Sequence, residues 1–285
     1  MTGRGLLGFS SVTDECPTLN TAVISKTTSR DNVHYVPLTT EHKEVAGNDT
    51  MTVTTTFAIN AVGNNFYSHP SSSVTVDYDG NVTSTAYTFD STKGVMTEQT
   101  TNYDNTSMYE TTVYAGYARH GGKWLPSSVT KRRKHKDDNN VFSAKTLYEY
   151  DSHGNVTSMT EHAGTPQALK SSFTHDTYGN ITSTRSTGTG VAPVTIYEVY
   201  DAAGRNKIKQ YTSPASSVTQ YTYDHFGNML TETDITIQSR PITRKFTYDG
   251  WNRPLSVTKP DGTAINYIRG WGAVDEYRYF VKSVE

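Results

Sequence analysis

The chain lacks several features that would point to common classes of protein. Its 285 residues include one cysteine, Cys16, which excludes an internal disulfide framework and a multi-cysteine metal site. No apolar run is long enough to cross a bilayer, so we expect no membrane span. The 26 basic and 28 acidic residues leave a net charge of -2, which gives no general attraction to nucleic acid.

Good helix formers are also scarce, whereas residues that suit a pleated sheet are abundant. The chain has 20 Tyr and 9 Phe together with many Thr and Val, and Leu and Ala are few. No segment shows an apolar period of 3.6 residues over three turns. Composition and patterning therefore predict an all-β protein with almost no helix.

A short motif recurs along the second half of the chain. Aromatic residues at alternate positions are followed by Asp, by two variable residues and by Gly, then often by Asn. The five aspartates stand 25, 25, 23 and 25 residues apart. A degraded copy at residues 76–82 has Asp79 and Gly80 as its predicted turn pair. The predicted turn residues are Asp79, Gly80, Asp151, Gly154, Asp176, Gly179, Asp201, Gly204, Asp224, Gly227, Asp249 and Asn252.

Each part of the motif has a physical role in a β-hairpin. Alternate aromatic residues lie on one face of a strand. Asp at the start of a turn accepts hydrogen bonds from backbone N–H groups two or more residues later, and Gly supplies positive φ. The predicted aromatic layer consists of Tyr148, Tyr150, Phe173, Tyr200, Tyr221, Tyr223, Phe246 and Tyr248.

A single hairpin is marginally stable in water, so neighbouring hairpins must pair edge to edge. Because strands twist with a fixed hand, the sequence predicts an array of antiparallel β-hairpin repeats that forms a curved, spiralling sheet. We expect a β segment at residues 1–73, the repeat array at 74–270 and a continuation of the array at 271–285.

The repeated unit resembles the tyrosine-aspartate (YD, or Rhs-type) repeats of bacterial polymorphic toxins, toxin-complex B/C shells and teneurins. A second likeness lies at residues 3–14, where an R-G-x-L-G-F segment and V-T-D resemble the segment that precedes the repeats in large Rhs and toxin-complex shells. That position is internal in the family, which implies that the chain is a fragment of a longer protein. The resemblance implies a partial β-shell, and some relatives enclose a C-terminal toxin domain.

The sequence departs from this family in two respects. The D-P-x-G-x-x-G-type segment that closes the Rhs core, with its self-cleaving aspartates, is absent, and no variable toxin domain follows the repeats. Enclosed cargo and self-cleavage therefore do not carry over to the chain itself.

No catalytic, cofactor or metal site is expected. The repeat aspartates could be read as catalytic carboxylates or calcium ligands, but a calcium loop needs several oxygens from one short segment and each turn offers one Asp. The nine His residues show no H-x-x-x-H or H-E-x-x-H spacing. A basic run at residues 131–138 is read as a solvated hairpin tip, with a docking patch for an acidic partner as the alternative.

The sequence therefore predicts a non-catalytic structural protein, part of a shell that scaffolds or encapsulates a cargo domain. Its expected partners are the rest of its own polypeptide, and exposed sheet edges predict self-association. The alternative is a surface module that binds glycan or a partner protein through exposed aromatics, with Trp124, Trp251 and Trp271 as candidates. The resemblance implies a secreted or envelope-associated bacterial protein, although Met1 is followed by no apolar signal core.

Overall fold

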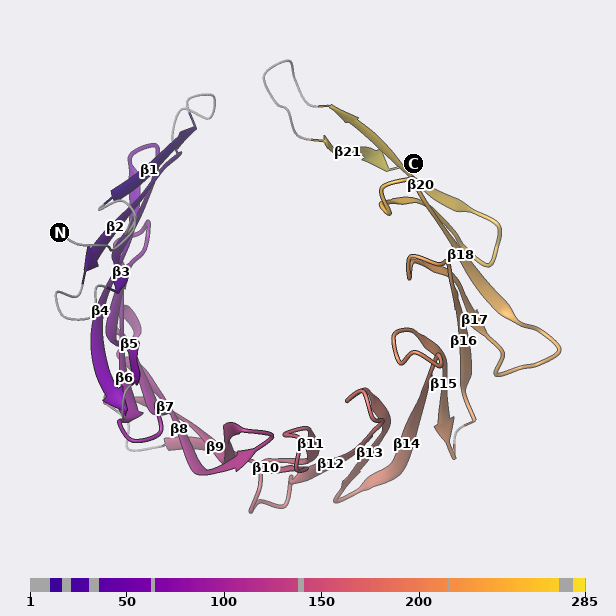
Figure 1. Cartoon of the computed structure of the whole chain (residues 1–285), viewed down its shortest axis with the longest axis horizontal. Helices are drawn as coiled ribbons and strands as arrows, with labels where there is room; N and C mark the ends of the chain where they lie inside the picture. Colours follow the sequence, from indigo (N-terminus) through magenta and orange to yellow (C-terminus); the bar gives the residue numbers. More distant parts are fainter. Residues whose placement is uncertain are drawn as a thin grey trace. The chain divides into compact units, whose positions relative to one another are not determined.

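The computed structural model describes residues 11–16, 22–30, 36–62, 65–137, 141–214, 216–271 and 279–284. These residues form antiparallel strands, and their helical structure consists of one 3-10 turn, η2 (Asp104–Thr106). No helix in the described part of the chain is long and apolar enough to cross a membrane. The predicted all-β array of antiparallel hairpins is confirmed (Figure 1). The expected 3–9 segment lies outside the described residues.

The chain divides into two compact units, which are described separately. Unit 1 comprises residues 1–154 and 161–165, and unit 2 comprises 155–160 and 166–285. The strands of unit 1 are β1 (Ser11–Cys16), β2 (Ala22–Arg30), β3 (Pro37–Ala46), β4 (Asp49–Val62), β5 (Asn65–Val76), β6 (Val82–Asp90), β7 (Val95–Tyr103), β8 (Met108–His120), β9 (Lys123–His135) and β10 (Val141–Tyr150). Each pairs antiparallel with the next one in the chain.

Unit 2 continues the same pattern with shorter strands. Its strands are β11 (Val156–Glu161, whose last residue is in unit 1), β12 (Leu169–His175), β13 (Ile181–Gly188), β14 (Val191–Tyr200), β15 (Lys207–Ser213), β16 (Val218–Tyr223), β17 (Met229–Asp234), β18 (Ile242–Tyr248), β19 (Pro254–Thr258), β20 (Ala264–Trp271) and β21 (Tyr279–Val284). From β12 onward, consecutive strands are antiparallel neighbours.

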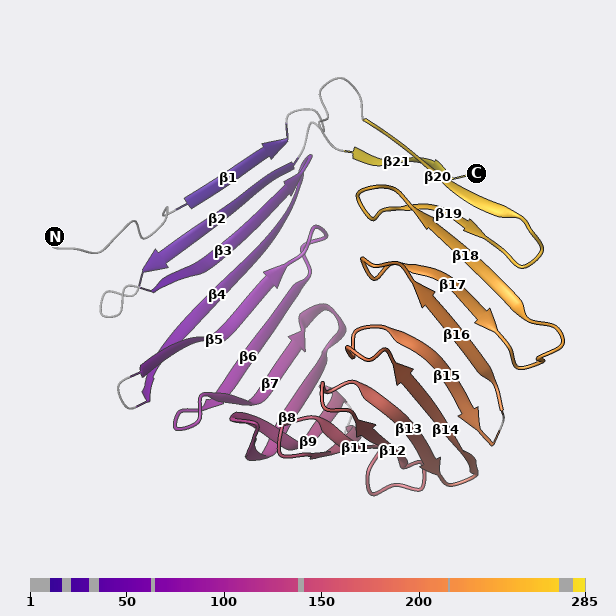
Figure 2. The same ribbon diagram turned by 45° about the vertical axis from the view of Figure 1, so that its right-hand side comes forward.

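The motif turns of unit 2 all lie at the same end of its strands, and this row of turns is called the turn edge (Figure 2). They join β12 to β13, β14 to β15, β16 to β17 and β18 to β19, and follow one another along that edge (Figure 2). A β-bulge precedes each turn, for example between Thr222 and Tyr223. Because each repeat places its turn at this edge, the same turn residues recur once per hairpin along the unit.

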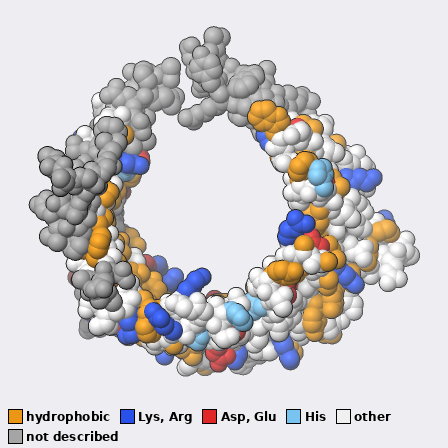
Figure 3. Space-filling view, in the orientation of Figure 1, with side chains coloured by type: hydrophobic (Ala, Val, Ile, Leu, Met, Phe, Trp, Pro, Cys, Tyr) orange, Lys and Arg blue, Asp and Glu red, His pale blue; other side chains and the backbone are white. Residues whose placement is uncertain are grey.

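In each unit the described strands form a single layer (Figure 2). No hydrophobic side chain is fully buried in the described residues, and the three buried residues there are His69, Ser158 and Ser171. Apolar side chains therefore remain visible on the surface of both units (Figure 3). Burial comes from contact between neighbouring strands, as expected for an array in which each repeat contacts its neighbours.

The basic run forms the predicted hairpin tip only in part, because Lys136 and Asp137 lie in the turn after β9. Lys131 to His135 belong to β9, which is paired on one side with β8 and on the other with β10. Since alternate residues of a strand face opposite sides, Arg132 and Lys134 point away from Lys131 and Arg133. Arg133 also forms an ion pair with Glu110 on β8. The cations of the strand are thus divided between its two faces.

Candidate functional site: the aspartate turns and their exposed edge

Each motif turn is closed by the carboxylate of its aspartate. In the turn after β12, Asp176 Oδ1 accepts the backbone N–H groups of Tyr178 and Asn180, each at 2.9 Å. Asp176 Oδ2 accepts from Asn180 Nδ2 at 3.0 Å. The turn after β16 repeats these three bonds, from Phe226 N, Asn228 N and Asn228 Nδ2 to Asp224. The carboxylate is therefore occupied by donors within its own turn.

The fourth residue of the turn has the positive φ that the motif predicts. Its φ is 87° at Gly179, 66° at Gly204 and 91° at Gly227, and Asn252 adopts 60°. A non-glycine residue is uncommon in this region, and Asn tolerates it better than most. Backbone N–H groups of these residues donate to the carbonyl of the turn aspartate, for example Gly204 to Asp201 at 2.9 Å.

The degraded repeat at residues 76–82 has a different turn aspartate from the predicted one. Asp77, not Asp79, accepts the bonds, from Asp79 N at 2.9 Å, Asn81 N at 2.8 Å and Asn81 Nδ2 at 2.9 Å. Gly80 is the residue with positive φ, at 80°. The turn therefore has the full length of the other repeats, and Asp79 occupies the exposed position two residues after the turn aspartate.

These hydrogen bonds hold the turn aspartates in their ionised form. The side-chain hydrogen bond from Asn228 is the main cause that lowers the pKa of Asp224. The backbone N–H of Arg205 is the main cause for the lowered pKa of Asp201. The guanidinium of Arg253 lowers the pKa of Asp249 furthest of the repeat turns, to about 2.

The turn asparagine also reaches the next turn. Asn180 Nδ2 donates to the carbonyl of Gly204 at 2.7 Å, and Asn228 Nδ2 donates to Asn252 Oδ1 at 2.9 Å. The sequence gives no local signal for these contacts, because the acceptors lie 24 residues further along the chain. One amide therefore closes its own turn and joins two hairpins.

The predicted aromatic layer is half-buried. All eight of its residues are partly covered by neighbouring strands, and none is fully buried. Tyr223 donates its hydroxyl to the carbonyl of Lys207 at 2.8 Å, and Tyr150 donates to the carbonyl of Pro126 at 2.9 Å. Burial raises the pKa of both hydroxyls. The layer thus also satisfies backbone acceptors on the preceding strand.

The three tryptophans have different environments. Trp124 on β9 is half-buried, and the cationic groups of Lys93 and Arg119 lie 5.6 and 5.4 Å from its ring centroid. Trp251, at the tip of the last motif turn, is 80% exposed. The backbone of Trp271 belongs to β20, but its side chain lies outside the described part of the structure.

Trp124 is in unit 1 and Trp251 in unit 2, so each is described with its own unit. Trp251 belongs to a set of exposed turn-tip aromatics that the sequence analysis did not single out. The other members are Tyr178 and Phe226, 65% and 68% exposed, and each stands two residues after its turn aspartate.

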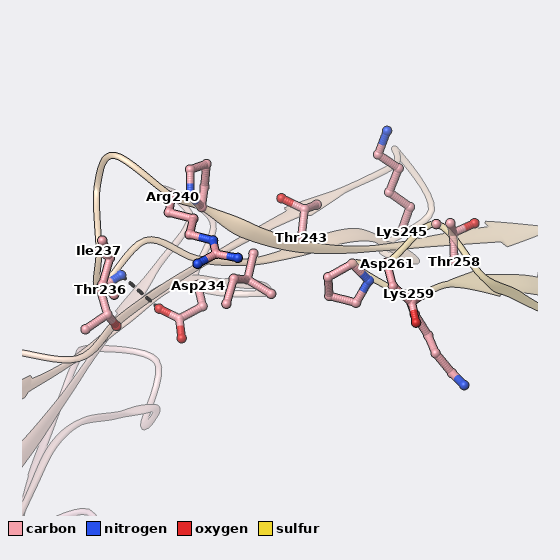
Figure 4. Close-up of a pocket in the computed structure, with 13 residues that line it drawn as sticks. Asp234, Thr236, Ile237, Arg240, Thr243, Lys245, Thr258, Lys259 and Asp261 are labelled. Atoms are coloured by element: carbon pink, nitrogen blue, oxygen red, sulfur yellow. Dashed lines mark hydrogen bonds between the residues drawn. The ribbon is translucent and has the colours of Figure 1, made fainter.

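A concavity lies at the opposite end of the strands of unit 2. It measures about 930 Å³ and is bounded by the 234–241 connection, β18 and the turn after β19. Arg240, Lys245 and Lys259 contribute cations, but Lys245 and Lys259 point to opposite sides (Figure 4). Asp234 and Asp261 accept hydrogen bonds from Thr236 and Thr263 respectively. The charged groups do not converge on one ligand position.

No group of three His, Cys, Asp or Glu side chains in the described ranges is arranged to hold a metal ion. The turn aspartates lie on successive hairpins, each with its own donors, and Asp201 and Asp224 both line a groove of about 540 Å³. Their carboxylates each accept three hydrogen bonds. The turn chemistry therefore supports a structural role for these carboxylates.

The fold and the turns define the class of protein: a single-layer, all-β array of hairpins closed by Asp-x-x-Gly turns. The family described as teneurin YD-shell matches residues 125–267, half of the chain. The chain belongs to the teneurin YD-shell family. No curated protein that was compared matches the sequence.

One solved structure with a TM-score of 0.50 shows the same fold. The crystal structure of TcdB2-TccC3 without its hypervariable C-terminal region has a TM-score of 0.50 and 13% identity, over 86% of this chain and 15% of that chain. TcdB2-TccC3 with Cdc42 gives a TM-score of 0.47 at 12% identity, over 87% and 16%. The Photorhabdus luminescens Tc holotoxin pore gives 0.46 at 13% identity, over 89% and 16%. The chain thus spans about one sixth of the length of these proteins.

Proposed function

We propose that the chain is a wall segment of a YD-type shell that encloses a cargo domain carried on the same polypeptide. The observation that supports this most directly is the bonding between successive turns. Asn180 and Asn228 join neighbouring hairpins by side-chain bonds, in addition to the strand pairing. A single layer without a buried apolar core suits a wall better than a compact catalytic domain.

Electron microscopy of the full-length protein tests this proposal. A wall predicts a hollow β-body, and a domain inside it would resist added protease until the wall is opened. A compact solid particle, or a cargo domain that is digested as fast in the intact protein as in isolation, contradicts the proposal. We also propose that the full-length protein is secreted or associated with the cell envelope. Fractionation of the producing cells tests this, because the protein should then be found in the medium or in the envelope fraction.

The alternative function, predicted from the three tryptophans, is glycan recognition. One observation supports it. Trp251 is exposed, whereas Trp124 is covered by neighbouring strands and cations. A glycan array with the purified chain tests it directly. Absence of binding, together with protection of the tryptophans from fluorescence quenching, would count against this function.

The proposed self-association of the chain concerns its sheet edges. β1 is paired with β2 on one side, and the described part of the chain provides no strand for its other side. Unpaired edge groups promote strand addition between molecules. Sedimentation over a range of concentrations should show dimers or larger species, and a monomer at all concentrations would contradict this expectation.

A further inference from the structure

Three aromatic side chains of unit 2 are exposed although the wall does not need them. Tyr178, Phe226 and Trp251 are 65%, 68% and 80% exposed. They stand at the same position of three turns, while Ala203 occupies that position in the turn between Tyr178 and Phe226. Exposed aromatic residues gathered on one edge are typical of interaction surfaces.

The turns hold these aromatic residues in fixed positions. The backbone N–H of each donates to Oδ1 of the turn aspartate at 2.9 Å. The ring of Tyr178 lies against Gly204 of the next turn, so close that a Cβ there would meet its Cδ2 at 2.2 Å. Arg253 lies over the ring of Trp251, 5.1 Å from its centroid. Little side-chain entropy would be lost when a partner binds the rings of Tyr178 and Trp251, which already have these contacts.

A groove lies beside Phe226, between the 201–206 turn and the 224–228 turn. It measures about 540 Å³, and Ile208, Tyr221 and Phe226 give it apolar walls. Arg205 also lines it, and within the described structure its guanidinium has no ion-pair partner. The carboxylates of Asp201 and Asp224 are already occupied by donors from their own turns. Arg205 therefore provides the groove with a hydrogen-bond donor that is not engaged in an ion pair.

The spacing of the turns matches a particular peptide conformation. Equivalent tips on successive hairpins are two strands apart, which is about 10 Å. A polyproline II helix has three residues per turn and rises about 3.1 Å per residue, so that the same face recurs about every 9.3 Å. Phe226 and Trp251 stand on successive motif turns, and Tyr178 stands two turns before Phe226. The aromatic tips can therefore contact every third residue of such a helix.

The chemistry of the groove also favours a proline-rich segment over other extended ligands. Proline has no backbone N–H, and the carbonyl groups of a polyproline II helix are free to accept hydrogen bonds. Such a ligand needs donors, which Arg205 supplies. A single-stranded nucleic acid would place phosphates beside the ionised carboxylates of the turns, and a polysaccharide needs acceptors for its hydroxyl groups as well as donors.

We propose that the turn edge of unit 2 from Tyr178 to Trp251 docks a proline-rich protein segment in the polyproline II conformation, centred on the groove beside Phe226. Aromatic-lined grooves recognise such segments in several unrelated domains. The inference goes beyond the wall function and does not depend on it, since the edge can be tested in this chain alone.

Calorimetric titration of the whole chain with an acetylated and amidated peptide of about ten prolines tests the proposal. The peptide should bind, and a Gly-Ser peptide of equal length should not. Phe226→Ala and Trp251→Ala should each weaken binding about tenfold, and Arg205→Gln should weaken it several-fold. Phe142→Ala is the matched control, because Phe142 is 65% exposed on β10 and lies in unit 1.

Several results would overturn the proposal. Absence of proline-peptide binding, or preferential binding of cellotetraose or a short oligothymidine, would assign the edge to another function or to none. An equal loss of affinity in Phe142→Ala and Phe226→Ala would show that the groove is not the site. Circular dichroism checks the fold of each variant, and Phe226→Leu provides a second variant that keeps apolar bulk at the tip but lacks the aromatic ring.

Discussion

At the residue scale, the turns depend on one position whose backbone has positive φ. At Gly227, φ is 91°, and an added Cβ would meet nothing closer than Asn206 Oδ1, at 3.6 Å. Space around the residue is therefore adequate, and the conformation alone selects glycine. Gly250, two residues before Asn252, has no such φ and no atom within 4 Å of an added Cβ.

Gly227→Val should lower the stability of the β16–β17 hairpin by about 1–3 kcal/mol, because a β-branched residue resists positive φ. The matched variant Gly250→Val should change it far less, since it adds the same side chain where the backbone is unstrained. Thermal melting of both variants provides the comparison. Equal melting temperatures would show that the turn conformation does not limit the residue at 227.

A second residue-scale property is the acidity of Asp249. Its pKa is lowered from 3.8 to about 2, first by the Arg253 side chain and then by backbone N–H groups, against the opposing effect of burial. A carboxyl with a lowered folded-state pKa stabilises the fold above its unfolded value and loses that contribution as the pH falls through its folded value. The contribution of Asp249 is therefore present above about pH 4 and disappears toward pH 2.

Carboxyl-detected NMR titration should find the Asp249 midpoint near pH 2. Arg253→Gln should raise that midpoint while leaving it below 3.8, because the backbone N–H groups of Trp251 and Arg253 still donate to the carboxylate. Asp224, which has no arginine partner, serves as the internal control. An unchanged Asp249 midpoint in the variant would contradict the assigned cause.

At the element scale, the turn asparagine joins two hairpins. Asn180 Nδ2 donates to Asp176 Oδ2 within its turn and to the Gly204 carbonyl in the next. Strand pairing fixes the hairpins along their lengths, and this amide fixes them at the turn edge. The same donor therefore contributes to local and to longer-range order.

Asn180→Ala should destabilise unit 2 by about 1–3 kcal/mol, because two hydrogen bonds are lost and the Gly204 carbonyl loses a donor. Asn266→Ala is the control, since Asn266 is exposed on β20. Urea denaturation monitored by circular dichroism compares them. If Asn266→Ala lowered the free energy of unfolding as much as Asn180→Ala, the loss could not be assigned to the hydrogen bonds of Asn180.

Local sequence was sufficient to predict the hairpins and their turns, because the Asp, Gly and aromatic positions act within one repeat. It assigned Asp79 in place of Asp77 because residues 77–80 offer two aspartates, and the structure selects the one four residues before Asn81. The basic run was interpreted as a hairpin tip, but pairing with β8 and β10 places Lys131 to His135 in a strand, and Lys136 and Asp137 lie in the turn. Contacts between turns join residues 24 positions apart, so no local sequence pattern predicts them.

At the scale of each unit, stability is distributed along the array. The absence of a buried apolar side chain among the described residues means that each strand depends on its immediate neighbours. Damage to one hairpin should therefore remain local, in contrast to a globular domain with one core.

Hydrogen exchange measured by mass spectrometry tests this expectation. In Gly227→Val, amides of β16 and β17 should lose protection, whereas those of β12 and β13 should keep the values of the unmodified chain. Wild-type protein under identical conditions is the reference. Uniform loss of protection across unit 2 would show that the unit unfolds as one cooperative domain.

The hydrogen bonds between turns also make the mechanical resistance of unit 2 depend on the direction of the applied force. Strand pairing resists force along the strands through many hydrogen bonds at once, but force applied along the turn edge meets the amides of Asn180 and Asn228 at separate turns. Peeling from that edge would break these links in succession, at low force and with short extension per step. Shearing along the strands would require many bonds to rupture together. A wall built in this way can open from its edge without losing the hairpins that compose it.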